Sequence, residues 1–303
     1  MTENSAINKN VSKKRPEGLS AEEARMYDDF QIGGHEREMP ESERLEQLAS
    51  FIDAHYDKPA GWETEAQQVE AKQVEAEQIE AGHPSSQRGD ARAAIENYLA
   101  RLPDRITHAA MIMLGSAADH SLPVTAYAQG IDTRADEFGR WYLPENPRGV
   151  AVAVVGGWWY AGAAREMSWE PEIAALAGYS QRAVLSVHFP LQPEATAKHA
   201  NAFVRRALES VRTTEFTTTT DTDQLAAWGK WAGADLMLQH ADLVDALALT
   251  FPSANTINTT DISAAGGVGT RVMLQELTAH RHVATPTTAR AAIREISDFW
   301  GGH

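Results

Sequence analysis

Two histidines near the C-terminus have the residue type and spacing of a metal-binding pair. His280 and His282 are separated by one residue, and imidazole nitrogens are common ligands of transition metals. The chain has no cysteine, and no cluster of carboxylates accompanies the pair in the sequence. The lack of cysteine also excludes disulfides, thiolate zinc sites and a cysteine nucleophile. We therefore expect surface histidines here, with no bound metal and no cofactor.

A glycine-rich segment at residues 266–269 has the look of a phosphate-binding loop. It lacks the Lys-Ser/Thr pair that follows the glycines of such a loop, and it does not join a strand to a helix. We interpret it as a connecting loop.

Another group of glycines follows a strand-like run at residues 226–228. Gly229 and Gly233 are the ends of a G-x-x-x-G turn, and small residues are needed where a strained turn packs closely against its neighbours. A turn of this kind can present a nucleophile to a substrate. Its central residue here is Trp231, whose indole has no lone pair that can attack a carbonyl.

Strand-like and helix-like segments alternate through the rest of the chain. Two strands close together, followed by strict alternation with helices, predict a mostly parallel sheet with helices on both faces. The predicted strands are 124–128, 140–143, 150–155, 183–188, 226–228, 247–251 and 272–277. The predicted helices are 91–114 (interrupted at Pro103), 171–179, 195–211, 232–241 and 287–300.

The composition limits the possible partners. The 303 residues include 27 Lys and Arg against 42 Asp and Glu, a formal net charge of −15. Nucleic acids and anionic membranes attract clustered positive charge, so we expect neither as a partner. The longest apolar stretches, residues 108–118 and 150–164, are shorter than the roughly 20 residues of a membrane-spanning helix. No apolar region follows the N-terminal positive charges, so we predict no secretory signal and a cytoplasmic protein.

The acidic excess is concentrated near the N-terminus. Residues 1–20 are polar and are predicted to form a disordered tail. Residues 21–89 are predicted to form an acidic helical arm or linker, in which residues 45–52 place four apolar side chains on one helical face. The same region holds three tandem five-residue repeats without an apolar stripe, which suit either an exposed linker or a docking arm. The α/β domain is predicted to span residues 90–303.

Three segments, in this order, resemble esterases and lipases of the hormone-sensitive-lipase type in the α/β-hydrolase superfamily. VAVAVVGGWWYAG (150–162) resembles the family's strand and H-G-G-G-W-x-x-G motif, in which backbone N–H groups form the oxyanion hole. VLSVHFPLQPE (184–194) resembles a strand followed by Y-R-L-A-P-E. LAAWGKWAGADLM (225–237) resembles the nucleophile elbow, G-x-S-x-G. The resemblance covers roughly residues 122–300 and implies an α/β-hydrolase-like fold.

The residues at the family's catalytic positions are different in this chain. Trp231 stands at the position of the serine. Gly156 and Gly157 match two oxyanion glycines, whereas Trp158 stands at the third. His280 to His282 stand where the family has its acid, and the chain ends where an eighth strand and the catalytic histidine would follow. The resemblance thus implies a degenerate member with no catalytic residues and a sheet shortened at its C-terminal end.

The aromatic residues at these positions have two interpretations. Trp158 and Trp231 either fill a disused cleft or, with Trp159, His280 and His282, line a cleft for an apolar or sugar-like ligand.

Three functions follow from these alternatives. The first is a catalytically inactive hydrolase-like protein, a pseudohydrolase that binds a protein partner or a small ligand. The second is an active esterase or acyl hydrolase with a displaced nucleophile, such as Ser253 or Ser263. The third is a small-molecule sensor that uses the tryptophan-lined cleft.

Overall fold

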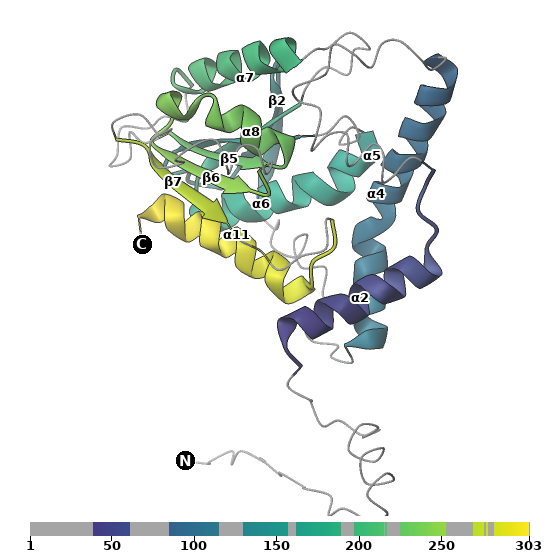
Figure 1. The fold of residues 1–303 in the computed structure, drawn as a ribbon. Helices are drawn as coiled ribbons and strands as arrows, with labels where there is room; N and C mark the ends of the chain where they lie inside the picture. The colour runs from purple at the N-terminus through teal and green to yellow at the C-terminus, as the bar shows by residue number, and fades with distance from the viewer. Residues whose placement is uncertain are drawn as a thin grey trace, which may run out of the picture. The chain divides into compact units, whose positions relative to one another are not determined.

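A computed structural model gives the fold of the chain (Figure 1). The chain divides into two units, Met1–Pro40 and Glu41–His303, and the helices and strands described below lie in the second. The structure describes residues 39–60, 85–114, 130–156, 162–188, 197–214, 216, 225–252, 269–275, 277 and 282–302.

A seven-stranded mixed sheet runs through the second unit, in the order β1-β2-β4-β3-β5-β6-β7 (Figure 1). The pairs β1–β2 and β2–β4 are antiparallel, and the remaining neighbours are parallel. This confirms the predicted mostly parallel sheet. The strands are β1 (Asp132–Asp136), β2 (Gly139–Leu143), β3 (Val150–Val155), β4 (Ala183–Val187), β5 (Ala226–Lys230), β6 (Ala246–Thr250) and β7 (Arg271–Gln275).

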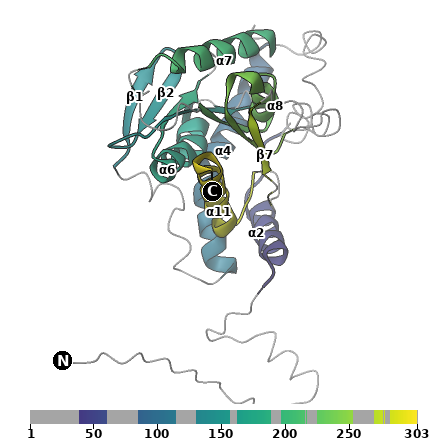
Figure 2. The same cartoon turned by 90° about the vertical axis from the view of Figure 1, so that its left-hand side faces the viewer.

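The central strand β3 shows why the sheet needs cover on both faces. All six of its residues are buried, and they alternate between two hydrophobic clusters on opposite faces of the sheet. Helices α7 (Ala197–Val211) and α8 (Ala232–Leu238) cover one face, above the sheet in Figure 2. Helices α6 (Glu170–Ser180) and α11 (Pro286–Gly301) cover the other.

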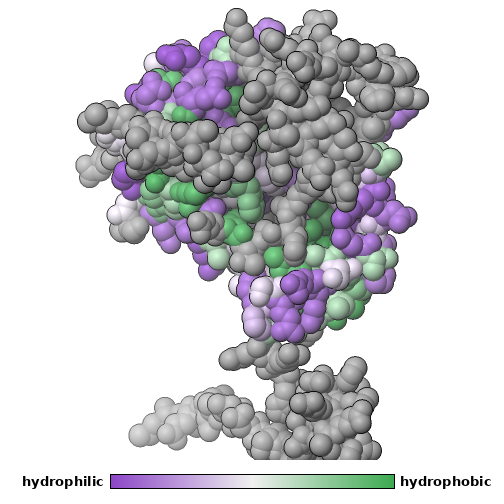
Figure 3. Space-filling model, in the orientation of Figure 1, coloured by the Kyte–Doolittle hydropathy of each residue, from purple (hydrophilic) through white to green (hydrophobic). Residues whose placement is uncertain are grey.

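Two N-terminal helices extend the cluster on the α6 side. They are α2 (Glu41–His55) and α4 (Ser85–Met113). Leu48 and Ile52 of α2 belong to the same buried cluster as Leu99 of α4. Hydrophilic residues dominate the outward face of α2 (Figure 3). The predicted domain boundaries at residues 20 and 89 stay predictions.

The predicted interruption at Pro103 is wrong, because α4 continues through it. A proline inside a helix cannot donate to the carbonyl four residues earlier, here that of Leu99. The Ser168 hydroxyl donates to this carbonyl instead, at 2.9 Å. Ser168 lies in a π-helical turn, η4 (Arg165–Trp169), between the short α5 (Gly162–Ala164) and α6. A tertiary hydrogen bond thus replaces the backbone hydrogen bond that Pro103 cannot make.

Two other details of the prediction differ from the structure. Strand β1 was not predicted, because all five of its residues are exposed and its sequence, DTRAD, has no apolar alternation. Helix α8 ends at Leu238 rather than at residue 241, and a 3-10 turn, η5 (Ala241–Leu243), follows it. The predicted strand at 124–128 lies outside the described residues.

Candidate functional site

The carboxyl ends of β3 and β5 meet where the chain changes direction across the sheet. From β3 the chain continues to β4 on one side, and from β5 to β6 on the other. Val155 pairs with Lys230 at this edge, and the Gly156 amide donates to the Lys230 carbonyl at 3.0 Å. Open α/β sheets bind their ligands at such switch points. This edge is therefore the candidate site.

Three glycines allow the turn after β5 to pack against the end of β3. A Cβ atom on Gly156 would lie 2.3 Å from the Ala232 Cβ, and one on Gly233 would lie 2.2 Å from the Val154 carbonyl oxygen. A Cβ atom on Gly229 would lie 2.5 Å from the Cα of residue 234. These distances are too short for any larger residue, so the glycines have a packing role.

Trp231 is the residue at the tip of this turn. Its backbone has φ 53° and ψ −128°, which is strained for a bulky side chain. The Trp231 amide donates to the Thr250 carbonyl at 2.9 Å, and α8 begins at the next residue. Strand, sharp turn and helix therefore form an elbow whose tip carries an indole. No serine, threonine or cysteine occurs between Ala226 and Leu238.

Aromatic rings gather around the Trp231 indole. The Phe251 ring, just after β6, is nearly parallel to it at 12°, with centroids 6.4 Å apart. The His282 imidazole meets it edge-on, with centroids 4.5 Å apart. All three side chains are half-buried. The structure thus brings Trp231 and His282, two of the predicted cleft residues, into contact, and the cleft itself stays a prediction. Gly157, Trp158, Trp159 and His280 lie outside the described residues, so their predicted roles stay predictions.

Lys230 and Glu172 form an ion pair beside the elbow. The Lys230 Nζ lies 2.7 and 2.9 Å from the two carboxylate oxygens of Glu172, on α6. It also lies 4.7 Å from the ring centroid of Trp231 and within 6 Å of those of Trp169 and Trp228. This ion pair was not predicted from the sequence, because residues 172 and 230 are far apart along the chain and no local pattern connects them.

A network of largely buried hydrogen bonds lies beneath the elbow. The Trp228 indole N–H donates to the Thr250 hydroxyl at 2.9 Å, and this hydroxyl donates to Gln275 Oε1 at 2.8 Å. The Gln275 amide nitrogen donates to the Ala292 carbonyl and to the Glu295 carboxylate, each at 2.8 Å. The network connects β5, β6 and β7 to α11, which holds the edge strand in place.

A second polar cluster surrounds Glu170 at the start of α6. Arg140 Nη1 lies 2.6 Å from its carboxylate, His188 Nε2 3.1 Å and Arg165 Nε 3.3 Å. Burial alone raises the pKa of Glu170. Hydrogen bonds from His188 and Tyr142 and the charge of Arg140 outweigh burial and lower it. Burial and the charge of Glu170 raise the pKa of Tyr142, which keeps the phenol protonated as a donor.

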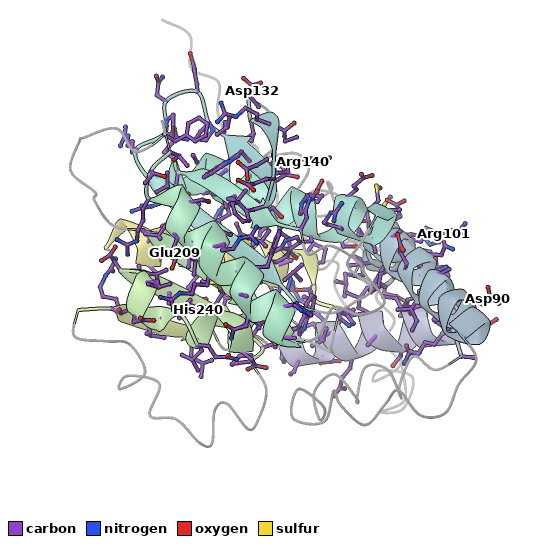
Figure 4. All side chains as sticks on the ribbon, turned by 90° about the horizontal axis from the view of Figure 1, so that it is seen from above. Asp90, Arg101, Asp132, Arg140, Glu209 and His240 are labelled. Atoms are coloured by element: carbon purple, nitrogen blue, oxygen red, sulfur yellow. The ribbon has the colours of Figure 1, made fainter. Side chains whose placement is uncertain are left out.

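The Glu170 cluster belongs to the β2–β4 side of the sheet. Figure 4 shows Arg140 toward the end of the sheet that carries Asp132, and His240 at the opposite end, beyond α7. Since β3 separates β4 from β5, the cluster lies two strands away from the elbow. It holds β2, β4 and η4 together.

Two other features are not found among the described residues. No three or more of their His, Asp and Glu side chains converge in a way that could hold a metal ion. None of the helices among them is both long and apolar enough to cross a membrane.

Solved structures share this arrangement of strands and helices. Esterase E25 is 15% identical, and the match covers 91% of this chain and 99% of that one, with a TM-score of 0.50. The chain has an α/β-hydrolase fold. The thermostable carboxylesterase EstE1, from a metagenomic library, is 16% identical over 68% of this chain and 98% of its own, with a TM-score of 0.44.

Esterase B from Lactobacillus rhamnosis is a more distant match, at 17% identity and a TM-score of 0.35. It covers 45% of this chain, which spans only 55% of the length of that esterase. No protein-family model and no curated protein matches the chain. At these identities the likeness establishes the hydrolase fold, and function has to be argued from the elbow.

Proposed function

We propose that the chain is a hydrolase-fold protein without serine-hydrolase activity, which binds a small ligand at the carboxyl edge of β5 and β6. The observation that carries the proposal is Trp231 at the tip of the elbow. Acyl transfer through a covalent intermediate needs a hydroxyl or thiol activated by a neighbouring base. The indole N–H is only a donor, and the indole has no group that can form an acyl ester.

Two polar side chains beside the elbow support the same conclusion. The Lys230 ammonium is hydrogen-bonded to both oxygens of Glu172, and a protonated amine has no lone pair for attack. The Thr250 hydroxyl is buried and takes part in two internal hydrogen bonds. Neither side chain is prepared to act as a nucleophile. The half-buried aromatic rings are instead suited to contact with an apolar ligand.

Ligand binding rather than disuse is favoured by the strained backbone at Trp231. Glycine at the tip would relieve the strain of this positive-φ conformation. A large aromatic residue is held there at φ 53°, in contact with two further rings. Strain of this kind is concentrated at functional sites.

Covalent labelling and esterase assays test the proposal. We expect purified protein to show no labelling by a fluorophosphonate probe and no hydrolysis of p-nitrophenyl acetate or butyrate. A Trp231→Phe variant, which keeps an aromatic ring, is the matched control for Trp231→Ser, which restores a hydroxyl. Labelling of the wild-type protein would overturn the proposal in favour of an esterase with a displaced nucleophile. Mapping the labelled residue would then decide between Ser253, Ser263 and another serine.

A further inference from the structure

Two aromatic residues after neighbouring parallel strands both have a positive φ angle. Trp231 follows β5 with φ 53°, and Phe251 follows β6 with φ 52°. Among the described residues, the only other residue than glycine with positive φ is Gln181, which caps the end of α6. Bulky side chains rarely adopt this conformation, and its occurrence at adjacent strand ends suggests a function.

The two strained turns are joined, so their rings are held in a fixed relation. The Trp231 amide donates to the carbonyl of Thr250, the residue before Phe251. The ring planes differ by only 12°, and the centroids are 6.4 Å apart. A flat ring that lies parallel to one of these side chains would therefore also lie nearly parallel to the other, and aromatic groups prefer such offset stacking. His282 fixes the indole from a third loop, with its ring edge-on.

The charges beside the rings indicate what kind of ring would fit. Lys230 lies over Trp231, but both oxygens of Glu172 neutralise its ammonium. This ion pair favours neither an anionic nor a cationic ligand. A sugar would need polar partners for its hydroxyls, and two polar side chains among the described residues of the elbow, Thr250 and Lys230, already make internal hydrogen bonds. An uncharged flat ring needs only the aromatic faces.

From this geometry we infer that Trp231 and Phe251 bind an uncharged planar aromatic ring at the elbow. The inference rests on the proposed function, because it names the ligand class of the same site. The ring stacks parallel to the two side chains. His282 keeps the indole in place and does not need to contact the ligand.

Calorimetric titration with two matched alcohols tests this inference. The probes are 2-naphthol and decahydro-2-naphthol, which have the same ring skeleton but differ in aromaticity. We expect 2-naphthol to bind about tenfold more tightly to the wild-type protein, since stacking adds to the effect of buried area. Trp231→Leu and Phe251→Leu should each weaken its binding by about tenfold. Trp231→Phe should retain the preference for 2-naphthol.

Phe299→Leu is the control for the loss of an aromatic side chain elsewhere. Phe299 lies on α11 with its ring 5.0 Å from the guanidinium of Arg271, the first residue of β7. That is the opposite edge of the sheet from the elbow. Phe299→Leu should leave the affinity for 2-naphthol unchanged, and thermal melting checks that each variant is folded.

Several results would overturn the inference. Equal affinities of the two alcohols, both lost in Trp231→Leu, would show an apolar site without aromatic preference and leave the proposed function intact. No binding of either alcohol, or binding unaffected by both leucine variants, would remove the aromatic-ring site. Fluorophosphonate labelling of the wild-type protein would overturn the proposed function independently of the titration.

Discussion

Thr250→Val should destabilise the protein strongly, although valine has nearly the same shape as threonine. Thr250 is 1% exposed, and its hydroxyl connects the Trp228 indole N–H to Gln275 Oε1. Removing the hydroxyl leaves one buried donor and one buried acceptor without partners. Each such group costs about 2 kcal/mol, so the free energy of unfolding should fall by about 4 kcal/mol.

Thr250→Ser is the matched control, because it keeps the hydroxyl and loses only a methyl group. It should cost about 1 kcal/mol. Urea unfolding followed by circular dichroism, with equal slopes for all variants, measures both changes. A difference of less than about 1 kcal/mol between the unfolding free energies of the valine and serine variants would refute the claim that this hydroxyl stabilises the hydrogen-bond network.

A double-mutant cycle with Trp228→Phe gives a second test. In the wild-type protein this change removes the indole N–H and leaves the Thr250 hydroxyl without a donor. In the Thr250→Val background it removes an N–H that already lacks its partner. The second cost should therefore be smaller by about 1–2 kcal/mol. Additive costs would show that the two groups are not coupled.

Three further predictions concern other parts of the fold. Gly156→Ala should lower the free energy of unfolding, measured by urea titration, by roughly 3 kcal/mol, since the added Cβ would lie 2.3 Å from the Cβ of Ala232. Gly130→Ala is the control: Gly130 has φ +80° and no atom within 4 Å of an added Cβ, so this change should cost only about 1 kcal/mol. Glu170→Gln should destabilise the protein at pH 7 but much less at pH 3. The lowered pKa of Glu170 stabilises the fold above its ordinary value of 4.5, and this contribution is lost as the pH falls through the folded-state value. An equal loss at both pH values would contradict this account. Ser168→Ala should cost about 1 kcal/mol in the wild-type protein, because the Leu99 carbonyl loses its hydrogen bond. The cost of Ser168→Ala should nearly vanish in a Pro103→Ala background, where the backbone N–H of residue 103 can donate to the Leu99 carbonyl instead. Thermal melts of the four proteins measure both costs, and an equal cost in the two backgrounds would contradict this account.

Local patterns were sufficient to predict most of the sheet. The continuous apolar run at 150–155 and the strands that follow it were predicted within a few residues, because a strand buried on both faces has apolar residues at consecutive positions. Strand β1 is exposed along its length, so its sequence has no run of apolar residues that would predict a strand. The effect of Pro103 also could not be predicted, because the donor that compensates for it is Ser168, far along the chain.

The sequence by itself determined which chemistry the elbow can contain. The spacing of Gly229 and Gly233 located a sharp turn. The side chain at its centre, that of Trp231, is an indole in any fold that the chain adopts. The neighbours of that indole were decided only by tertiary structure. Phe251, Glu172 and His282 come from other turns and helices, and they meet at the elbow because parallel strands bring their carboxyl ends to one edge of the sheet. No sequence spacing encodes these contacts, since each depends on the order in which the strands pair.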